Sequence, residues 1–373
     1  MLYARTILDK LHKKMGKGKA IVIVGARQVG KTTLMQQLLG DIPHLFINGD
    51  DPLDRQLMDN PNTAQLRSII GKHKVVLIDE AQRIQDIGLT LKIIIDQFKE
   101  VQLLVSGSSA FDLANKTQEP LTGRKWEYTL FPLSWEELEE SLGYLEATKQ
   151  LELRMLYGFY PDVLNNPGME QDILGQLIDG YLYKDLLAFS GIRKPEELEN
   201  LVKALALQIG NEVSYNELSQ LLGIDKNTVG NYIRILEQGF VIYRLGTYSR
   251  NLRNEIKRNQ KIYFYDNGIR NAVLGNFIPL DSRADKGALW ENFLLSERIK
   301  HNAYHGKRVR SYFWRTKQQQ EVDYVEEING KVEGFEFKWQ ASAREKLPKS
   351  FMDTYQAKIK VFDRHNFRDF VLQ

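Results

Sequence analysis

The sequence of 373 residues contains no cysteine. This absence excludes a disulfide scaffold, a zinc site built on thiolates and a thiol nucleophile. Long hydrophobic runs are also missing, because no window holds 18 uninterrupted apolar residues and residues 1–20 lack the apolar core of a signal peptide. We therefore expect a cytoplasmic protein without membrane spans and without a membrane partner.

No charge of one sign dominates. The 51 lysines and arginines nearly balance the 48 aspartates and glutamates, so the net charge of +3 does not indicate a nucleic-acid partner, and only a local basic patch can do so. Hydrophobic residues make up 43% and charged residues 27%, which is typical of globular proteins and excludes a disordered chain. At about 150 residues per domain, the length predicts two or three domains.

Short apolar runs alternate with helical stretches in the first third of the chain. Strands this apolar, separated by helices, indicate a parallel sheet that is covered on both faces. The predicted strands are 20–24, 45–48, 75–79, 101–106 and 128–133. From 134 to about 210 the pattern is helical.

A glycine-rich loop follows the first predicted strand and precedes a helical stretch. It fits the pattern G-x-x-x-x-G-K-[ST], whose backbone N–H groups surround phosphates at a helix N-terminus. In this pattern Lys31 reaches the β- and γ-phosphates, and the Thr32 hydroxyl is a Mg²⁺ ligand. The sequence predicts that ATP and Mg²⁺ bind at Gly25, Ala26, Arg27, Gln28, Val29, Gly30, Lys31, Thr32 and Thr33.

Two carboxylates, Asp79 and Glu80, end the third apolar run. A pair of this kind alone is more often a solvated turn, but a buried strand downstream of a phosphate loop delivers both to one site. We expect Asp79 to join Thr32 around Mg²⁺. We expect Glu80 to orient or deprotonate the attacking water.

Ser108 and Arg124 are further candidates for ATP hydrolysis. Ser108 lies among small hydroxyl residues after the fourth predicted strand, where a polar side chain can contact the γ-phosphate or the water; a helix N-cap is the alternative. Arg124 precedes the fifth predicted strand, and its guanidinium can stabilise the γ-phosphate charge, in trans within a ring or otherwise in cis. A surface arginine is the alternative, and Arg27 is a weaker second candidate.

Residues 214–237 carry the pattern of two short helices joined at Gly223. Apolar positions 218, 221, 222, 229, 233 and 236 face inward in this pattern. Strand-like runs at 240–245 and 261–265 follow, so we expect a winged helix. The polar positions predicted on the outer face are Lys226, Asn227, Asn231, Tyr232 and Arg234.

A basic patch between residues 244 and 261 would suit a phosphate backbone, with docking of a protein as the alternative. Only Glu255 opposes its basic residues, which are Arg244, Arg250, Arg253, Lys257, Arg258 and Lys261.

Acidic residues and a lysine gather on strand-like runs at 311–315, 321–325 and 334–339. Glu336 and Lys338 share a strand face, and a neighbouring strand can add Asp323. Such a set can bind Mg²⁺ for phosphodiester hydrolysis, whereas cross-strand charge pairs are the alternative. His301 and His305 lie four residues apart, but no third ligand lies at metal-ligand spacing nearby, so we expect solvated histidines.

Several of these segments occur together and in order in one known family. They are GARQVGKTTL, VVLIDEAQR, LLVSGSSA, LTGRKWEYTLFPLSWEE, YFYDNGIRNAVL, GALWENFLLSE, QEVDYV and FEFKW. The chain thereby resembles bacterial and archaeal ATPases with an AAA+ domain of the AAA_14 type and a C-terminal DUF4143 domain. The resemblance implies an ASCE-type P-loop core, a winged helix and a C-terminal fold similar to PD-(D/E)XK nucleases. Its matching positions here are Glu291, Asp323, Glu336 and Lys338.

The predicted fold class is α/β, with four parts. They are a P-loop ATPase domain at 1–134, a helical segment at 135–209, a winged helix at 210–275 and a restriction-endonuclease-like α/β domain at 284–373. One predicted function is a Mg²⁺-dependent AAA+ ATPase that acts on nucleic acid, DNA in the first place, through the winged helix and the nuclease-like domain. The alternative is an ATP-dependent switch whose C-terminal domain binds a partner without cleaving. The sequence leaves a homo-oligomer open.

Overall fold

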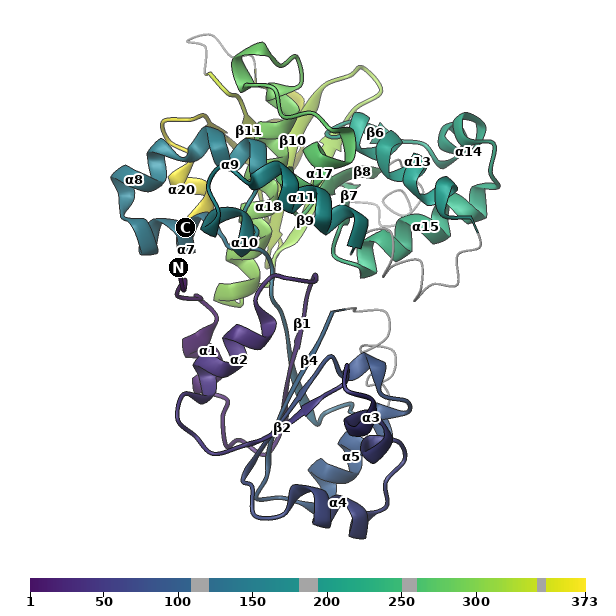
Figure 1. Ribbon diagram of the computed structural model, residues 1–373. Helices are drawn as coiled ribbons and strands as arrows, with labels where there is room; N and C mark the ends of the chain where they lie inside the picture. Colours follow the sequence, from purple (N-terminus) through teal and green to yellow (C-terminus); the bar gives the residue numbers. More distant parts are fainter. Residues whose placement is uncertain (109–120, 181–193, 250–259, 341–346) are drawn as a thin grey trace. The chain divides into compact units, whose positions relative to one another are not determined.

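The computed structural model describes residues 1–108, 121–180, 194–249, 260–340 and 347–373 (Figure 1). They form two compact units. The P-loop unit comprises Leu2–Leu133 with Gln238–Phe240, and the C-terminal unit comprises Met1 with Ser134–Glu237 and Val241–Gln373. Within the described ranges, no helix combines the length and apolar character needed to cross a membrane.

The P-loop unit is built on a parallel five-stranded sheet in the order β2-β3-β4-β1-β5. This confirms the parallel sheet predicted from the alternation of strands and helices. The elements are α1 (Leu8–His12), β1 (Ala20–Val24), α2 (Lys31–Leu39), β2 (Leu45–Asn48), α3 (Pro52–Met58), α4 (Thr63–Ile70), β3 (Val75–Asp79), η1 (Ala81–Arg83), α5 (Ile87–Gln97), β4 (Gln102–Gly107) and β5 (Lys125–Thr129).

Helices cover both faces of this sheet, with α1 and α2 on one side and α3, α4 and α5 on the other (Figure 1). Val22 and Val24 of β1 pack into one core with Ile70 of α4 and Leu91 of α5. Because alternate residues point to opposite faces, Ile21 and the other intervening residues are buried on the second face. The strands are therefore apolar throughout.

The fifth strand lies earlier than predicted, at Lys125–Thr129 instead of 128–133. β5 is an edge strand that pairs only with β1, and its residues are partly exposed, so polar residues are tolerated in it. The apolar residues Leu130 and Leu133 are buried after the strand has ended. Burial without strand pairing explains the misplaced prediction.

The C-terminal unit combines helices with one seven-stranded sheet in the order β12-β11-β10-β9-β7-β8-β6. Its strands are β6 (Glu212–Val213), β7 (Ile242–Thr247), β8 (Gln260–Phe264), β9 (Arg310–Arg315), β10 (Glu321–Ile328), β11 (Lys331–Phe337) and β12 (Lys358–Phe362). Its helices are α7 (Trp135–Leu142), α8 (Tyr144–Lys149), α9 (Leu151–Tyr157), α10 (Pro161–Asn165), α11 (Glu170–Leu177), α13 (Pro195–Leu207), α14 (Tyr215–Leu222), α15 (Lys226–Gln238), α17 (Asn267–Leu274), η4 (Leu280–Ser282), α18 (Lys286–His305), α19 (Lys349–Tyr355) and α20 (Arg368–Val371).

This sheet joins segments that the sequence pattern assigns to separate parts. β7 and β8 belong to the predicted winged helix, yet β7 pairs in parallel with β9, where Gly246 lies opposite Tyr312 and Thr247 opposite Phe313. The helical segment, the two-helix motif and the last strands therefore lie in one unit. The four-part domain division stays a prediction.

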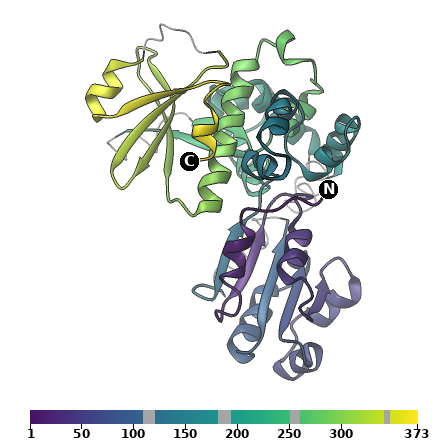
Figure 2. The same ribbon diagram turned by 90° about the vertical axis from the view of Figure 1, so that its left-hand side faces the viewer.

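The long helix α18 packs on one face of this sheet together with α20 (Figure 2). Arg298 of α18 donates to both carboxylate oxygens of Glu326 on β10, at 2.7 and 2.8 Å, and to the carbonyl of Phe370 in α20 at 2.8 Å. Phe351 of α19 packs against Trp314 and other residues of a separate hydrophobic cluster.

Helices α14 and α15 have the inward face that the sequence predicts, with two exceptions. Leu218, Val229, Ile233 and Leu236 are buried. Leu221 is 65% exposed, although an inward position was predicted. Tyr232, predicted on the outer face, is buried, and its hydroxyl donates to Glu197 of α13 at 3.2 Å.

Candidate functional site: a phosphate loop and an acidic cluster

The predicted phosphate loop connects β1 to α2 in the P-loop unit. Gly25 lies so close to the end of β5 that a Cβ at this position would stand 2.1 Å from the carbonyl oxygen of Leu130. Gly30 has a φ of 94° and is the N-cap of α2, which Lys31 begins. The two glycines thus make the tight turn that directs backbone N–H groups toward a bound anion.

Lys31 is buried inside this loop. Its Nζ donates to the carbonyl oxygens of Gly25 at 3.1 Å and Ala26 at 2.8 Å. Burial lowers the pKa of Lys31 to about 8, although the carboxylates of Glu80 and Asp79 act in the opposite direction. The ammonium is therefore held by neutral oxygens that a phosphate can replace.

Thr32 and Asp79 meet as predicted. The Thr32 hydroxyl donates to Oδ2 of Asp79 at 2.6 Å, and the hydroxyl of Ser106 donates to Oδ1 of the same carboxylate. β4 lies between β1 and β3, which brings Ser106 to this place. The oxygens of Thr32 and Asp79 are hard donors of the type that Mg²⁺ requires.

Glu80 and Ser108 are joined through a residue that the sequence reasoning missed. Nε2 of Gln82 donates to Oε2 of Glu80 at 2.5 Å and to Oγ of Ser108 at 2.8 Å. Glu80 has a φ of 47°, at the sharp turn where β3 passes into η1. Gln82 sits two residues after the carboxylate pair, but an isolated glutamine carries no signal that marks this role.

The other loop residues differ in exposure. Arg27 is half-buried, Gln28 and Thr33 are exposed, and Val29 is buried. Arg5, which no motif singles out, donates to the carbonyl oxygens of Val29 at 2.8 Å and Phe131 at 2.7 Å. Arg5 thereby fixes the loop from outside the motif.

Arg124 lies at the end of the sheet where β1 begins, opposite to the end that carries the phosphate loop. Its carbonyl accepts from the N–H of Ala20 at the start of β1, whereas the phosphate loop follows the end of β1. Its Nε donates to Asp96 at 2.8 Å. The five residues of β1, about 16 Å in length, separate Arg124 from the phosphate loop. Action of Arg124 in cis is therefore excluded by this geometry, and action in trans stays a prediction.

Asp323, Glu336 and Lys338 come together on β10 and β11 and just after β11. Nζ of Lys338 lies 2.9 Å from Oε2 of Glu336 and 3.6 Å from Oδ2 of Asp323, which also accepts from the N–H of Phe337 at 2.8 Å. Burial raises the pKa of Glu336 to about 7, and the charge of Asp323 adds to this shift. We call these three residues with Glu291 the acidic cluster.

Glu291 of α18 is held by residues that the sequence reasoning did not place in a site. Its Oε1 accepts from the Tyr263 hydroxyl at 2.5 Å and from Nζ of Lys261 at 3.2 Å. Lys261 also pairs with Glu321 at 2.5 Å. Burial raises the pKa of Glu291 to about 7, Lys261 opposes this shift, and Asp323 adds to it. Lys261 and Tyr263 are two residues apart on β8 and therefore share one face of the strand, which was the available sequence signal that both could contact one site.

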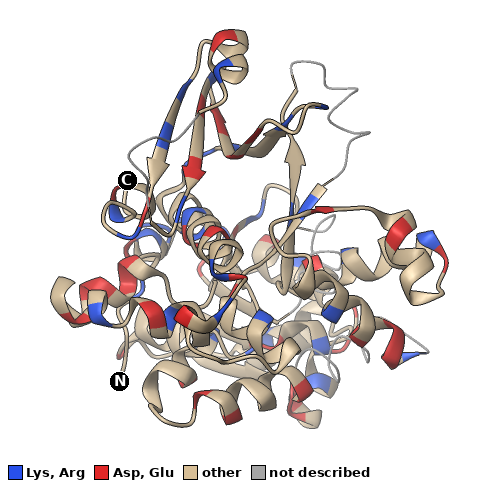
Figure 3. Cartoon of the chain, turned by 90° about the horizontal axis from the view of Figure 1, so that it is seen from above, with Lys and Arg blue, Asp and Glu red and all other residues tan. Residues whose placement is uncertain are grey.

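The basic patch predicted at 244–261 is not supported by its two described ends. Lys261 is buried in the ion pairs just given, and Arg244 pairs with Glu237. Arg250, Arg253, Lys257 and Arg258 lie outside the described residues. Basic and acidic residues are interspersed on the described helices (Figure 3).

The prediction that both histidines are solvated is wrong for His301. His301 is buried, and Oε2 of Glu136 lies 3.4 Å from its Nδ1 and 3.0 Å from Nε2 of His305. The carboxylate comes from α7, far away in the sequence, so spacing along the chain could not reveal it.

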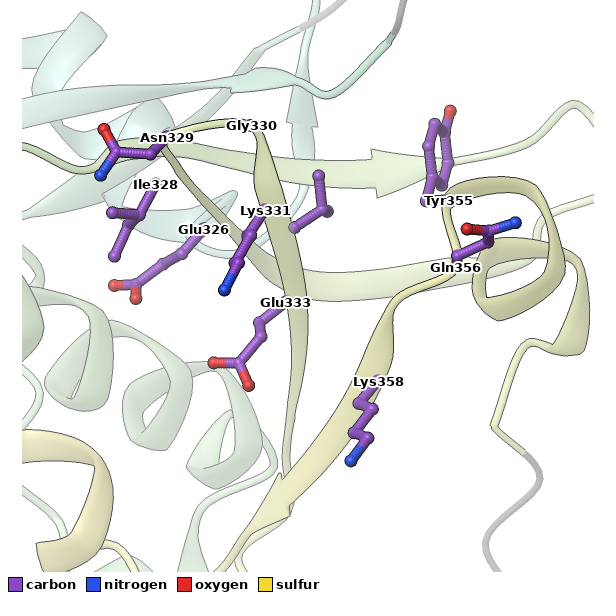
Figure 4. Close-up of a pocket in the computed structure, with 10 residues that line it drawn as sticks. Glu326, Ile328, Asn329, Gly330, Lys331, Glu333, Tyr355, Gln356 and Lys358 are labelled. Carbon is purple, nitrogen blue, oxygen red and sulfur yellow. The ribbon is translucent and has the colours of Figure 1, made fainter.

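A cavity of about 880 Å³ lies at the β10–β11 turn and contains none of the predicted site residues. Lys331, Glu333 and Lys358 line it beside Tyr355 and Gln356 (Figure 4). A second hollow, of about 790 Å³, is lined by residues of β7, β9 and the β9–β10 turn.

The parallel sheet, the phosphate loop and the Thr32–Asp79 pair define a P-loop ATPase. An AAA domain model matches residues 17–139, and models of two domains of unknown function, DUF8612 and DUF4143, match residues 148–279 and 286–368. The chain thus contains an AAA domain and a C-terminal DUF4143 domain, as the resemblance in the sequence implied.

Related proteins span most of the chain. An uncharacterized protein of Mycobacterium tuberculosis is 28% identical over 345 residues, which are 91% of this chain and 74% of the relative. One of Methanocaldococcus jannaschii is 22% identical over 86% of this chain and 75% of its own length. The Walker-type ATPase of Pyrococcus abyssi has a similar fold, with a TM-score of 0.53 and 15% identity over 73% of this chain and 96% of the other.

Proposed function

We propose that this protein hydrolyses ATP with Mg²⁺ at the phosphate loop and acts on nucleic acid, DNA in the first place, through its C-terminal unit. In this proposal the acidic cluster cleaves phosphodiester bonds. The observation that carries it is the convergence of Asp323, Glu336 and Lys338 in a chain that also has a phosphate loop with Thr32 hydrogen-bonded to Asp79.

The roles at the nucleotide site follow from the contacts. Lys31 exchanges its carbonyl partners for the β- and γ-phosphates, and the N–H groups at the start of α2 bind phosphate oxygens. Thr32 and Asp79 hold Mg²⁺, which neutralises developing phosphate charge when bound. Glu80 orients the attacking water, and Gln82 with Ser108 fixes the carboxylate.

Two features support metal-assisted hydrolysis at the acidic cluster. Glu336 and Asp323 are carboxylates in mutual repulsion, and a divalent cation between them would relieve it. Lys338 is half-exposed with its ammonium near both, so it can contact a scissile phosphate. The chemistry is attack of water on phosphorus with departure of one ester oxygen.

A second candidate function is an ATP-dependent switch whose C-terminal unit binds a partner without cleaving it. Lys261 favours this alternative, because its ammonium already pairs with Glu291 and Glu321 and balances their charge without a cation. In addition, the carboxylates of the acidic cluster do not all come within 4.8 Å of one another among the described residues, whereas the Glu136 group does.

The winged helix on α14, α15, β7 and β8 belongs to the proposal as the nucleic-acid contact. Lys226, Asn227, Asn231 and Arg234 are exposed on α15, as a recognition surface requires. Binding through several phosphates predicts an affinity that falls as salt rises. Salt-independent binding would assign this face to a protein partner.

The test is a cleavage assay on single- and double-stranded DNA and RNA with Mg²⁺ or Mn²⁺. Wild type and Lys31→Ala should cut, whereas Asp323→Asn and Lys338→Met should not. Lys360→Met is the matched control, because Lys360 lies on neighbouring β12 and pairs with Glu333, outside the acidic cluster. Absence of cutting by wild type, with ATP turnover intact, would leave the switch as the function.

A further inference from the structure

We propose that Glu136, His301 and His305 form a binding site for Zn²⁺ or a similar divalent first-row metal ion, separate from the nucleotide site and the acidic cluster. The three side chains come from the start of α7 and the end of α18. One oxygen or nitrogen from each lies within 4.8 Å of the others.

Two of the three distances between the donor atoms are near those of a tetrahedral centre, and the third is within 4.8 Å. Oε2 of Glu136 lies 3.0 Å from Nε2 of His305 and 3.4 Å from Nδ1 of His301. Ligand atoms around a tetrahedral Zn²⁺ with bonds of about 2.0–2.1 Å are about 3.3–3.4 Å apart. A small adjustment therefore places all three donors around one ion.

An independent observation points to a ligand here. Nδ1 of His301 is buried, and within the described part of the chain it lies 3.4 Å from Oε2 of Glu136 without hydrogen-bond geometry. A buried polar atom normally makes a well-formed hydrogen bond, whereas this nitrogen only faces the carboxylate of Glu136. An ion between the two atoms would bind both.

Local structure builds the site in two ways. His301 and His305 are four residues apart on α18, so they share one helix face, and their ring centres are 4.2 Å apart. Ser134 and Glu137 form a capping box at the start of α7, and the N–H of Trp135 donates to Glu297 of α18 at 2.6 Å. The first turn of α7, with Glu136, is thereby fixed against α18.

The donor set selects the class of ion. Two imidazole nitrogens and one carboxylate oxygen suit Zn²⁺ and its neighbours better than Mg²⁺ or Ca²⁺, which prefer oxygen. The side chain of His305 is 38% exposed and that of Glu136 is 25% exposed, so solvent reaches one side of the site. A water molecule can occupy the fourth position.

Lys307 stands on the other side of His301. Its Nζ lies 3.0 Å from Nε2 of His301, and it also contacts the backbone carbonyl of Gln373. Coordination through Nδ1 places the ring proton on Nε2. Lys307 is exposed and must then turn away from the ring, toward Gln373 or water.

The site is tested by calorimetric titration of the full chain with Zn²⁺ in excess Mg²⁺, which saturates sites made of oxygen donors. One ion per chain is expected. His305→Ala and Glu136→Gln should each weaken binding at least about tenfold, since each removes a direct ligand. His365→Ala, an exposed histidine of the same unit outside the cluster, should bind Zn²⁺ as wild type does.

Two further variants make the outcomes unambiguous. His301→Ala should also lose the site, and because His301 is buried, circular dichroism must show that this variant is folded. Asp323→Asn should keep Zn²⁺ binding, which separates this site from the acidic cluster. No binding by wild type, or unchanged binding by both His305→Ala and Glu136→Gln, would overturn the proposal and leave a histidine–carboxylate hydrogen bond.

Discussion

The lowered pKa of Lys31 makes ATP binding depend on pH in a defined direction. In the free protein this pKa is about 8, against an ordinary value of 10.5, because the ammonium is buried. Bound phosphates favour the charged form and should return the pKa to its ordinary range or above it. ATP binding therefore takes up a proton when the pH lies above 8.

The magnitude follows from the two values. At pH 7 nearly all Lys31 is charged, whereas at pH 9 about one tenth is charged in the free protein. The dissociation constant for ATP should thus rise about tenfold between pH 7 and pH 9, equal to about 1.4 kcal/mol. Below pH 7, Lys31 causes no further change in the dissociation constant, because it is already charged in the free protein.

The assay is calorimetry of Glu80→Gln with Mg²⁺-ATP, so that hydrolysis does not interfere. Repeating the titration at pH 9 in buffers with different ionisation enthalpies measures the proton uptake directly. Lys31→Arg is the matched control, because arginine does not titrate in this range. If the affinity for ATP stays the same from pH 7 to pH 9 and no proton is taken up, the argument is refuted.

Three other variants have defined outcomes. Glu80→Gln should bind ATP as wild type does and lose turnover, because only activation of water is removed; undiminished hydrolysis would contradict this role. Arg124→Ala should lose turnover and regain part of it when mixed with Glu80→Gln, as expected for action in trans; wild-type turnover by Arg124→Ala alone would dismiss that role. Arg298→Met should lower the free energy of unfolding in urea by about 3–5 kcal/mol, because Glu326 is left buried without its partner; a loss below 1 kcal/mol would show that the pair matters little.

The shape of the phosphate loop and the contact between Thr32 and Asp79 were predictable because they depend on local sequence. A phosphate loop needs glycines, a lysine and a threonine at fixed spacing, and Asp79 ends a strand that is apolar throughout. The parallel sheet was predictable for a similar reason, since burial on both faces leaves a continuous apolar run. The edge strand β5 lacked that signal and was misplaced.

Residues that act through distant contacts could not be predicted. Lys261 was expected on a basic surface, but Glu291 and Glu321 reach it from other elements and bury it. Glu136 lies 165 positions before His301, and their contact depends on the packing of α7 on α18. Neither contact leaves a periodic pattern in the sequence.

ATP turnover by the purified full chain, measured with and without DNA and RNA in Mg²⁺, tests the central claim most directly. The account predicts hydrolysis that nucleic acid stimulates and that Lys31→Ala and Glu80→Gln abolish. Hydrolysis that persists in both variants would contradict the assigned nucleotide site. Hydrolysis that no nucleic acid changes would contradict the proposed coupling between the P-loop unit and the C-terminal unit.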